Sequence, residues 1–302
     1  VCSSDLHLRT PWVVNRRLLL CSDLDRTILP NGPQSESKAA RKLLAALAAR
    51  PEVTLVYVTG RDRHLVTQAI ENYCLPQPDY VISDVGTSIY EVAGDSWQRW
   101  HQWQQEIAPD WNGLSDSDIR ALLLDIVELQ AQEPAKQNLY KSSYYVPLYA
   151  DTEALTHDIR QRLEHSGVSA NLVWSIDEPR GTGLLDVLPA SASKEHAIRF
   201  LMQRNGFELT DTVFAGDSGN DLPVLASEIP AVLVANASAE VRNAALARAE
   251  SGNAVDALYI ARGGFMGMNG NYTAGVLEGV VHYRPDVRSW LADSAAEVPA
   301  ND

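Results

Sequence analysis

Two aspartates, Asp23 and Asp25, come just after the short apolar run from Leu18 to Cys21, with only Ser22 between the run and Asp23, and Thr27 comes two residues after Asp25. Such a run predicts a buried strand, and in open α/β sheets ligands bind beyond the carboxyl ends of the strands. Two carboxylates held this close repel each other unless a cation or a shared proton intervenes. A neighbouring divalent metal would keep Asp23 ionised as a nucleophile, and Asp25 could then handle protons. Taken alone, the stretch is also compatible with an ordinary acidic turn.

Residues further along the chain fit the same chemistry, which is phosphoryl transfer. Asp23 would attack phosphorus and form an aspartyl phosphate, while Asp25 protonates the leaving oxygen and later activates water. Asp217 follows another predicted strand and would hold a metal together with Asp23; Asp25 is included in this metal set. Carboxylate oxygens are ligands that Mg²⁺ prefers, so we predict Mg²⁺ as the cofactor. The predicted phosphoryl donors are the Thr59 hydroxyl, the Gly60 amide and the Lys194 ammonium, with Asp221 orienting Lys194.

Composition excludes several partners. The 302 residues contain 39 acidic and 25 basic side chains, a net charge of -14, which repels nucleic acid and anionic membranes. A small phosphorylated substrate remains compatible, because a bound cation reverses the sign locally. The odd set of cysteines (Cys2, Cys21 and Cys74) favours a reducing compartment, so we predict a cytoplasmic protein. No secretory or membrane-spanning segment is recognised, and we expect a monomer.

The order of predicted elements indicates two structural units. Apolar runs alternate with helix-period segments over residues 16–93 and again over 189–291, which predicts an α/β core. Residues 94–188 are aromatic and mixed, with a helix near 117–131, and predict a smaller α+β cap. We therefore expect a Rossmann-like parallel-sheet core with the cap inserted after the third strand. Residues 1–15 lack clear periodicity and are expected to be a disordered leader outside the fold.

These segments resemble, in order and spacing, the four motifs of the haloacid dehalogenase superfamily of phosphatases. Asp23-Leu24-Asp25-Arg26-Thr27 is similar to the first motif, Thr59 to the second and Lys194 to the third. Gly216-Asp217-Ser218-Gly219-Asn220-Asp221 is similar to the fourth, and Asn220 is included among the substrate-binding residues. The likeness covers most of residues 17–285.

The position of the inserted cap indicates which subclass of this superfamily the chain resembles. The segment between the first two motifs has room for only one helix, so the cap lies between the second and third. This is similar to the subclass whose α+β cap follows the third strand, most of whose members remove phosphate from sugars. The segments that resemble the sucrose-phosphate phosphatases of bacteria and plants are Ser83–Tyr90, Asn138–Tyr144, Asp186–Pro189 and Gly275–Gly279. The resemblance implies hydrolysis of sucrose 6-phosphate, with a sugar-phosphate synthase as a candidate partner.

Residues of the cap should select the sugar, since the core motifs contact only the phosphoryl group and its metal. Lys141 and Tyr144 are the candidates, because a cap strand facing the core can offer an ammonium and a phenol to sugar hydroxyls; a solvated strand face is the alternative. Trp97, Trp100 and Trp103 recur at helical spacing, which is more typical of packing than of a sugar platform.

Three other functions share parts of this pattern. A relative acting on mannosylfructose phosphate or mannosylglycerate phosphate would carry the same motifs. A non-catalytic phosphosugar-binding domain would be expected to lack some of the acids, and here all are present. A phosphomutase of this family would place its cap between the first and second motifs, where this chain has no room.

Overall fold

The computed structural model of the chain describes residues 17–177 and 180–296. The predicted leader, residues 1–15, lies outside them.

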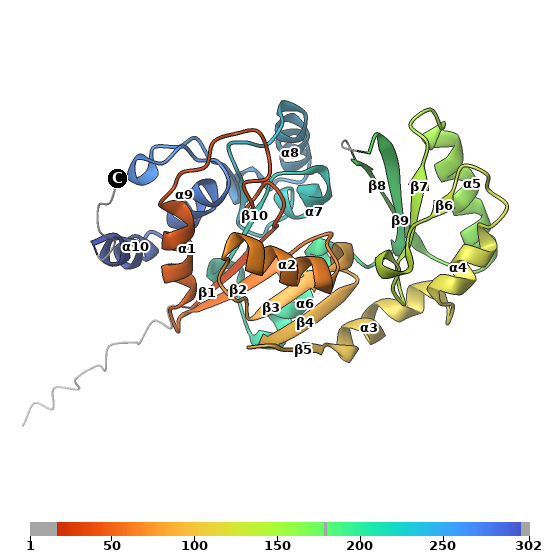
Figure 1. Cartoon of the computed structure of the whole chain (residues 1–302), viewed down its shortest axis with the longest axis horizontal. Helices are drawn as coiled ribbons and strands as arrows, with labels where there is room; N and C mark the ends of the chain where they lie inside the picture. Colours follow the sequence, from red (N-terminus) through yellow and green to blue (C-terminus); the bar gives the residue numbers. More distant parts are fainter. Residues whose placement is uncertain (1–16, 178–179, 297–302) are drawn as a thin grey trace, which may run out of the picture.

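A mostly parallel sheet forms the centre of the larger unit (Figure 1). Within the described residues its eight strands have the order β12-β11-β10-β1-β2-β3-β4-β5. Neighbours from β12 to β3 are parallel, whereas β4 and β5 add an antiparallel hairpin. All five residues of β1 are buried, as expected for a central strand covered on both faces. The bounds are β1 Leu18–Ser22, β2 Val53–Val58, β3 Tyr80–Ser83, β4 Ser88–Ala93, β5 Ser96–Arg99, β10 Thr212–Gly216, β11 Ala231–Leu233 and β12 Leu258–Ile260.

Helices cover both faces of this sheet, and each face has its own apolar cluster. One cluster is shared with α1 (Ala40–Ala48), α2 (Arg63–Tyr73), α9 (Thr273–Tyr283) and α10 (Val287–Ala296). The other is shared with α3 (His101–Ile107), α6 (Lys194–Asn205), α7 (Leu222–Leu225) and α8 (Ala239–Ser251). The core is thus a three-layer α/β fold, as the strand and helix pattern predicted.

Helix α9 carries a glycine in its interior because it packs very closely on the sheet. A Cβ atom at Gly279 would lie 2.1 Å from Cγ2 of Val232 on β11. Glycine is unfavourable in a helix interior, so its presence here is explained by this approach of helix to strand. The predicted Gly275–Gly279 motif therefore has a packing role in the core.

The cap is a second, antiparallel sheet that carries its helices on the side away from the core (Figure 1). In the described part of the chain this sheet has the order β6-β7-β9-β8. Its strands are β6 Gln130–Ala131, β7 Ser142–Val146, β8 Ala170–Asp177 and β9 Thr182–Pro189, and its helices are α4 Asp116–Leu122 and α5 Thr152–His165. The helix predicted near 117–131 ends at Leu122, since Leu124 and Val127 are 85% and 93% exposed and face no common apolar surface.

The junction between the units differs from the predicted start of the cap at residue 94, which falls inside the β4–β5 hairpin. Strand β5 pairs with β4 in the core sheet, and α3 packs Trp103 and Ile107 into a core cluster. We therefore propose that the cap begins near Ala108 and ends at Pro189. The two connecting segments contact each other, because the Asp110 carboxylate accepts hydrogen bonds from the backbone N–H (2.7 Å) and the hydroxyl (2.5 Å) of Ser191.

The three tryptophans at helical spacing pack against the core. Trp103 is fully buried and donates its indole N–H to the carbonyl of Gly86 at 3.0 Å. Trp100 makes an edge contact with Phe200 of α6, and Trp97 makes one with Tyr90. The three side chains therefore pack against the apolar core, as their spacing predicted, and do not form a sugar platform.

Candidate active site

The predicted acids meet at the carboxyl end of the core sheet. Asp23 follows β1 and Asp217 follows the neighbouring strand β10; both are buried, at 4% and 5% exposure. Asp23 also donates its backbone N–H to the carbonyl of Ala215, which fixes the end of β1 beside β10. The register of parallel strands thus brings together residues nearly 200 positions apart in the chain.

Lys194, the first residue of α6, lies between two carboxylates of this site. Its Nζ donates to Asp23 Oδ1 at 2.9 Å and to Asp221 Oδ1 at 2.7 Å, and all three side chains are buried. The other oxygen of Asp221 accepts the backbone N–H groups of Asp217 and Ser218, each at 3.0 Å. Asp221 therefore has both oxygens engaged and orients the lysine ammonium.

Gly216 explains how this arrangement fits at the end of β10. A Cβ atom at position 216 would lie 2.6 Å from the Asp221 carboxylate, closer than van der Waals contact permits. Any side chain there would displace Asp221 and, with it, Lys194. The glycine that precedes Asp217 is consequently required by the carboxylate packed over it.

Three carboxylates form a group that could hold a cation: Asp23, Asp217 and Asp221 each offer an oxygen within 4.8 Å of the others. Because Lys194 and two amides already engage Asp221, the oxygens of Asp23 and Asp217 are the more available ones. The contacts of Asp217 are long, at 3.4 Å from the Thr27 hydroxyl and 3.4 Å from Nε of Arg26. Hard carboxylate oxygens in this number fit Mg²⁺.

Electrostatics at the site point the same way. Burial raises the pKa of Asp217 to about 7, and the nearby Asp221 carboxylate adds to this shift. Burial also raises the pKa of Asp23, against the opposing effect of Lys194. Burial disfavours the charged form of Lys194, but Asp221 and Asp23 outweigh it, so the pKa of Lys194 is raised. The Lys194 ammonium bonds two of the three carboxylates and Arg26 lies 3.4 Å from the third, so a divalent cation would relieve the remaining repulsion.

Asp25 has different surroundings from Asp23. Its carboxylate accepts two hydrogen bonds from Arg61, at 2.8 and 2.7 Å, and one from the Asn31 side chain at 2.7 Å. Burial would raise the pKa of Asp25, but the hydrogen bonds and charge of Arg61 outweigh it and the pKa is lowered. Asp25 is not part of the carboxylate group described above, so this structure does not support its predicted role as a side-chain ligand of the metal.

A cavity of about 380 Å³ opens over these residues. Among the predicted residues, Asp23, Asp25, Gly60, Asn220 and Asp217 line it. Thr59, at the end of β2, is fully buried beneath, and its hydroxyl accepts the backbone N–H of Arg61 at 3.2 Å. The volume is suitable for a small phosphorylated ligand.

Three basic side chains in the cavity wall were not predicted: Arg26, Arg61 and Lys136. Arg26 and Arg61 stand directly beside the predicted Asp25 and Gly60, so their proximity in the sequence could have identified them. Lys136 comes from the cap, lies 3.8 Å from the core residue Asp62 and had no comparable signal. These cations make the cavity suitable for an anion despite the acidic composition of the chain.

The two predicted cap residues lie on opposite sides of the cap sheet. Lys141 is buried, donates to the Lys136 carbonyl at 3.2 Å and lies 3.6 Å from the Asp186 carboxylate. Tyr144 is 3% exposed and belongs to the apolar cluster beneath α4 and α5. The prediction that Tyr144 contacts the sugar is corrected on this ground, because side chains three positions apart in a strand point to opposite faces.

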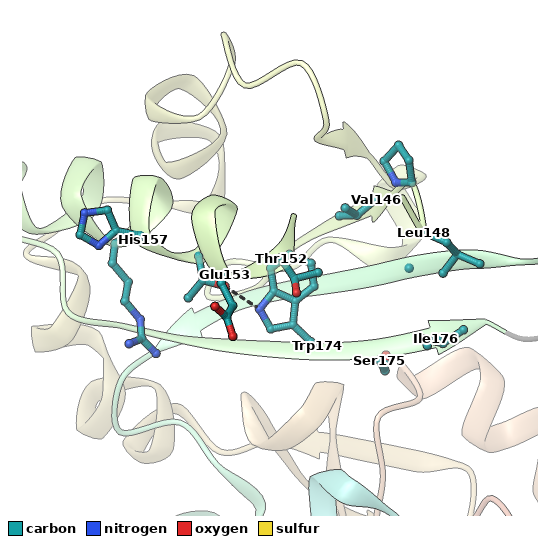
Figure 2. A pocket seen from close by; sticks show the side chains of 12 residues that line it. Val146, Leu148, Thr152, Glu153, His157, Trp174, Ser175 and Ile176 are labelled. Carbon is teal, nitrogen blue, oxygen red and sulfur yellow. Dashed lines mark hydrogen bonds between the residues drawn. The ribbon is translucent and has the colours of Figure 1, made fainter. Parts of the chain in front are cut away.

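A larger cavity, of about 760 Å³, lies in the cap and shares no lining residue with the smaller one in the described chain. Figure 2 shows it between α5, which contributes Thr152, Glu153 and His157, and the end of β8 with Trp174. The Trp174 indole donates to the Thr156 hydroxyl at 3.1 Å. Its walls carry none of the predicted acids, so the chemistry belongs to the smaller cavity despite the difference in size.

A doubly wound core with aspartates at two adjacent strand ends, a lysine paired with the first of them and an inserted cap defines a phosphatase of the haloacid dehalogenase type. The chain belongs to the sucrose-6F-phosphate phosphohydrolase family, whose model matches residues 16–284. It is accordingly a hydrolase of phosphate monoesters, and within this superfamily a sugar phosphatase.

Individual relatives agree with this assignment. A HAD-like hydrolase of Nitrosococcus oceani is 51% identical over 284 residues, 94% of this chain and 76% of the relative. A mannosylfructose-phosphate phosphatase of Agrobacterium fabrum is 30% identical over 74% of this chain and 85% of its own. The sucrose-phosphatase of Synechocystis sp. PCC6803, solved with sucrose and phosphate, has a TM-score of 0.70 at 25% identity, covering 89% of this chain and 98% of its own.

Two further features bear on the predictions from composition. In the described segments we find no helix whose length and apolarity would suffice to cross a membrane. Cys21 and Cys74 are free thiols, and Cys2 lies outside the described residues.

Proposed function

We propose that the protein hydrolyses sucrose 6-phosphate to sucrose and phosphate, with Mg²⁺ as cofactor and an aspartyl phosphate on Asp23 as intermediate. The observation that carries this proposal is the pairing of Asp23 with Lys194 beside Asp217, at the floor of a cavity that the cap residue Lys136 helps to close. The buried acids call for a cation, and that cation together with Arg26, Arg61 and Lys136 suits an anionic ligand such as a sugar phosphate.

In the first half of the reaction a carboxylate oxygen of Asp23 attacks phosphorus, and the bond from phosphorus to the sugar oxygen breaks. Lys194 keeps Asp23 oriented and the Gly60 amide, Thr59 and Lys194 donate to the phosphoryl oxygens as charge moves onto them. Asp23 and Asp217 would hold Mg²⁺, which when bound neutralises charge on the phosphoryl group.

Asp25 handles the protons in both halves. It donates a proton to the departing sugar oxygen and later takes one from the water that attacks phosphorus, which restores the Asp23 carboxylate. In this structure Arg61 holds Asp25 ionised, the state that suits the second half. For the first half the Arg61 contact must open, and the anionic substrate entering beside Arg61 provides a competing partner for the guanidinium.

Selectivity for the sugar is assigned to the cap. Lys136, which lines the cavity, lies on the same cap segment as Lys141, and Lys141 directly precedes β7. We propose that closure of the cap brings the Lys141 ammonium to a sugar hydroxyl. The connecting segments at Asp110 and Ser191 are the two places where the chain could bend.

The test is phosphate release by the purified full chain across a panel of phosphate esters with Mg²⁺. The panel contains sucrose 6-phosphate, mannosylfructose phosphate, mannosylglycerate phosphate, glucose 6-phosphate and p-nitrophenyl phosphate. We expect the highest kcat/KM on sucrose 6-phosphate. A higher kcat/KM on another ester would overturn the assignment of sucrose 6-phosphate as substrate but would leave the proposed phosphatase mechanism unchanged.

Mannosylfructose phosphate is the second candidate, because a phosphatase named for that substrate is 30% identical to this chain. Both candidates are disaccharide phosphates, made by transfer of a sugar onto a phosphorylated acceptor. A sugar-phosphate synthase would therefore supply the substrate and remains the proposed partner, and the monomeric state remains a prediction to be checked by light scattering.

A further inference from the structure

Arg26, the residue after Asp25, has an unfavourable backbone conformation. Its φ of 57° lies in the left-handed region, which residues with a Cβ atom rarely occupy. The turn is tight, because the N–H of Thr27 returns to the carbonyl of Leu24 at 3.2 Å. Contacts from elsewhere must hold Arg26 in this state, since outliers persist only where the surroundings fix them.

Two asparagines hold Arg26 at its two backbone polar groups. The Asn31 side chain accepts the Arg26 N–H at 2.8 Å, and the Asn236 amide donates to the Arg26 carbonyl at 2.6 Å. Asn31 comes from the same turn and also donates to Asp25. Asn236 comes from the carboxyl end of β11, is 4% exposed and reaches Arg26 across 210 residues of sequence.

Asn236 is itself fixed by a second strained residue. Its Oδ1 accepts the N–H of Tyr272 at 2.7 Å, and Tyr272 is fully buried with φ 51° and ψ -135°. The loop that precedes Tyr272 is anchored by Glu278, whose carboxylate accepts the N–H groups of Arg262 (2.9 Å) and Gly263 (2.8 Å). Strain of this kind is retained where a surrounding structure enforces it, most often at functional sites.

We infer that Asn236 is a positioning residue for Asp25. By holding the Arg26 carbonyl it keeps the turn left-handed, and the turn keeps the Asp25 carboxylate where it can protonate the departing oxygen. The inference rests on the proposed role of Asp25 as proton donor. No motif of the sequence pointed to Asn236, whose side chain bridges the first motif and Tyr272, the residue after the loop at 263–271.

The consequence is a dependence on the leaving group. Without Asn236 the peptide after Arg26 relaxes to an ordinary conformation, and Asp25, one residue earlier, moves away from the departing oxygen. Proton donation matters for an ester with a poor leaving group and much less for one with a good leaving group. Phenyl phosphate and p-nitrophenyl phosphate differ in this respect and carry no sugar, so cap recognition is left out of the comparison.

The experiment measures the first turnover of the Asn236→Asp variant, as the burst of phenol or p-nitrophenol released while Asp23 is phosphorylated, because the second half of the reaction uses Asp25 for both esters alike. This isosteric change removes the donor toward Arg26 and keeps the acceptor for Tyr272. We expect the burst rate on phenyl phosphate to fall about 10- to 100-fold, with less than about a threefold change in the burst rate on p-nitrophenyl phosphate. The matched control is Asn269→Ala, which removes a hydrogen bond from the same loop to the Ser35 carbonyl and should leave both rates unchanged.

A double-mutant cycle with Arg26→Gly tests the physical cause. Glycine adopts positive φ freely, so in that background Asn236→Asp should no longer alter the discrimination between the two esters. Persistence of the full discrimination in the glycine background would overturn the inference. If Asn236→Asp does not melt cooperatively, Asn236→Ala, which removes the same donor toward Arg26, is measured in the same cycle.

Asp25→Asn separates this inference from the proposed function. In one outcome, Asp25→Asn lowers the burst rate on phenyl phosphate but not on p-nitrophenyl phosphate, while Asn236→Asp lowers both burst rates equally. This outcome overturns the positioning role of Asn236 alone. If Asp25→Asn lowers the burst rate equally on both esters, Asp25 is not the proton donor, and the inference about Asn236 is wrong as well.

Discussion

The core and the cap both contribute polar side chains to the cavity of about 380 Å³, but they fix them to different degrees. In the core, Asp23, Lys194 and Asp221 are buried and joined by hydrogen bonds of 2.9 and 2.7 Å. In the cap, Lys136 is only partly buried and lies 3.8 Å from its nearest acidic partner in the core. The core groups are held in place by the sheet, whereas the cap group is held by a short irregular segment.

The difference teaches how the two tasks are divided. Phosphoryl transfer needs charges fixed to within a fraction of an ångström, and parallel strand ends provide this. Recognition of a sugar needs a surface that can open for the substrate and close on it, which a cap on two connecting segments allows. Changes to the core groups that contact the phosphoryl group and its metal should therefore affect every phosphate ester alike, and changes in the cap should affect only substrates that carry the sugar.

The largest effect is expected from Asp23→Asn. The amide is nearly isosteric but cannot form an acyl phosphate, so kcat should fall by several orders of magnitude, on the order of 10⁴-fold, on both sucrose 6-phosphate and p-nitrophenyl phosphate. Phosphate release and a thermal melt check the variant, with the exposed Asp95→Asn as control. More than about a tenth of the wild-type kcat would contradict the covalent role.

Removal of divalent metal should lower kcat nearly as much, and equally for substrates with and without the sugar. With Asp23 and Asp217 as carboxylate ligands, excess chelator should abolish hydrolysis of both esters, and Mg²⁺ should restore it. Ca²⁺ prefers more ligands at longer distances and should inhibit. Mg²⁺ should also raise the melting temperature of the wild type, but not that of Asp217→Ala. Full activity in chelator would rule the cofactor out.

A smaller, substrate-selective effect is expected in the cap from Lys141→Ala. Loss of one hydrogen bond to the sugar should cost about 1 to 3 kcal/mol in kcat/KM on sucrose 6-phosphate and leave p-nitrophenyl phosphate nearly unchanged. The exposed Lys38→Ala is the matched control. Since Asp186 loses its partner in this variant, a melt is required. Equal loss on both esters would assign Lys141 to closure or stability instead of recognition.

The smallest effect is expected from Tyr144→Phe, on the far side of the same sheet. The ring packs in the apolar cluster of the cap, and phenylalanine keeps these contacts, so kcat/KM on both esters should stay within about twofold. A selective tenfold loss on sucrose 6-phosphate would show that Tyr144 does reach the sugar, and the contrast between the two faces of the cap sheet would no longer hold.

Much of the core site could be predicted because its signal is local. An apolar run that ends in acids indicates a strand end, and parallel strands place their carboxyl ends together whatever the details of packing. Asp23 and Asp217 were predicted in this way, whereas Lys194 was predicted from its place at the start of a helix. The period of two along a strand could also have separated Lys141 from Tyr144, since residues three apart lie on opposite faces.

Tertiary structure alone decided the remaining features. Which face of the cap sheet is turned to the core depends on the packing of α4 and α5, and nothing in the strand itself specifies it. The hairpin that moves the cap boundary joins the core because β5 finds its partner in β4. The side-chain amide of Asn236 donates to the backbone carbonyl of Arg26 across 210 residues. A contact between groups so far apart leaves no periodicity or spacing in the sequence, because only the folded sheet brings the two segments together.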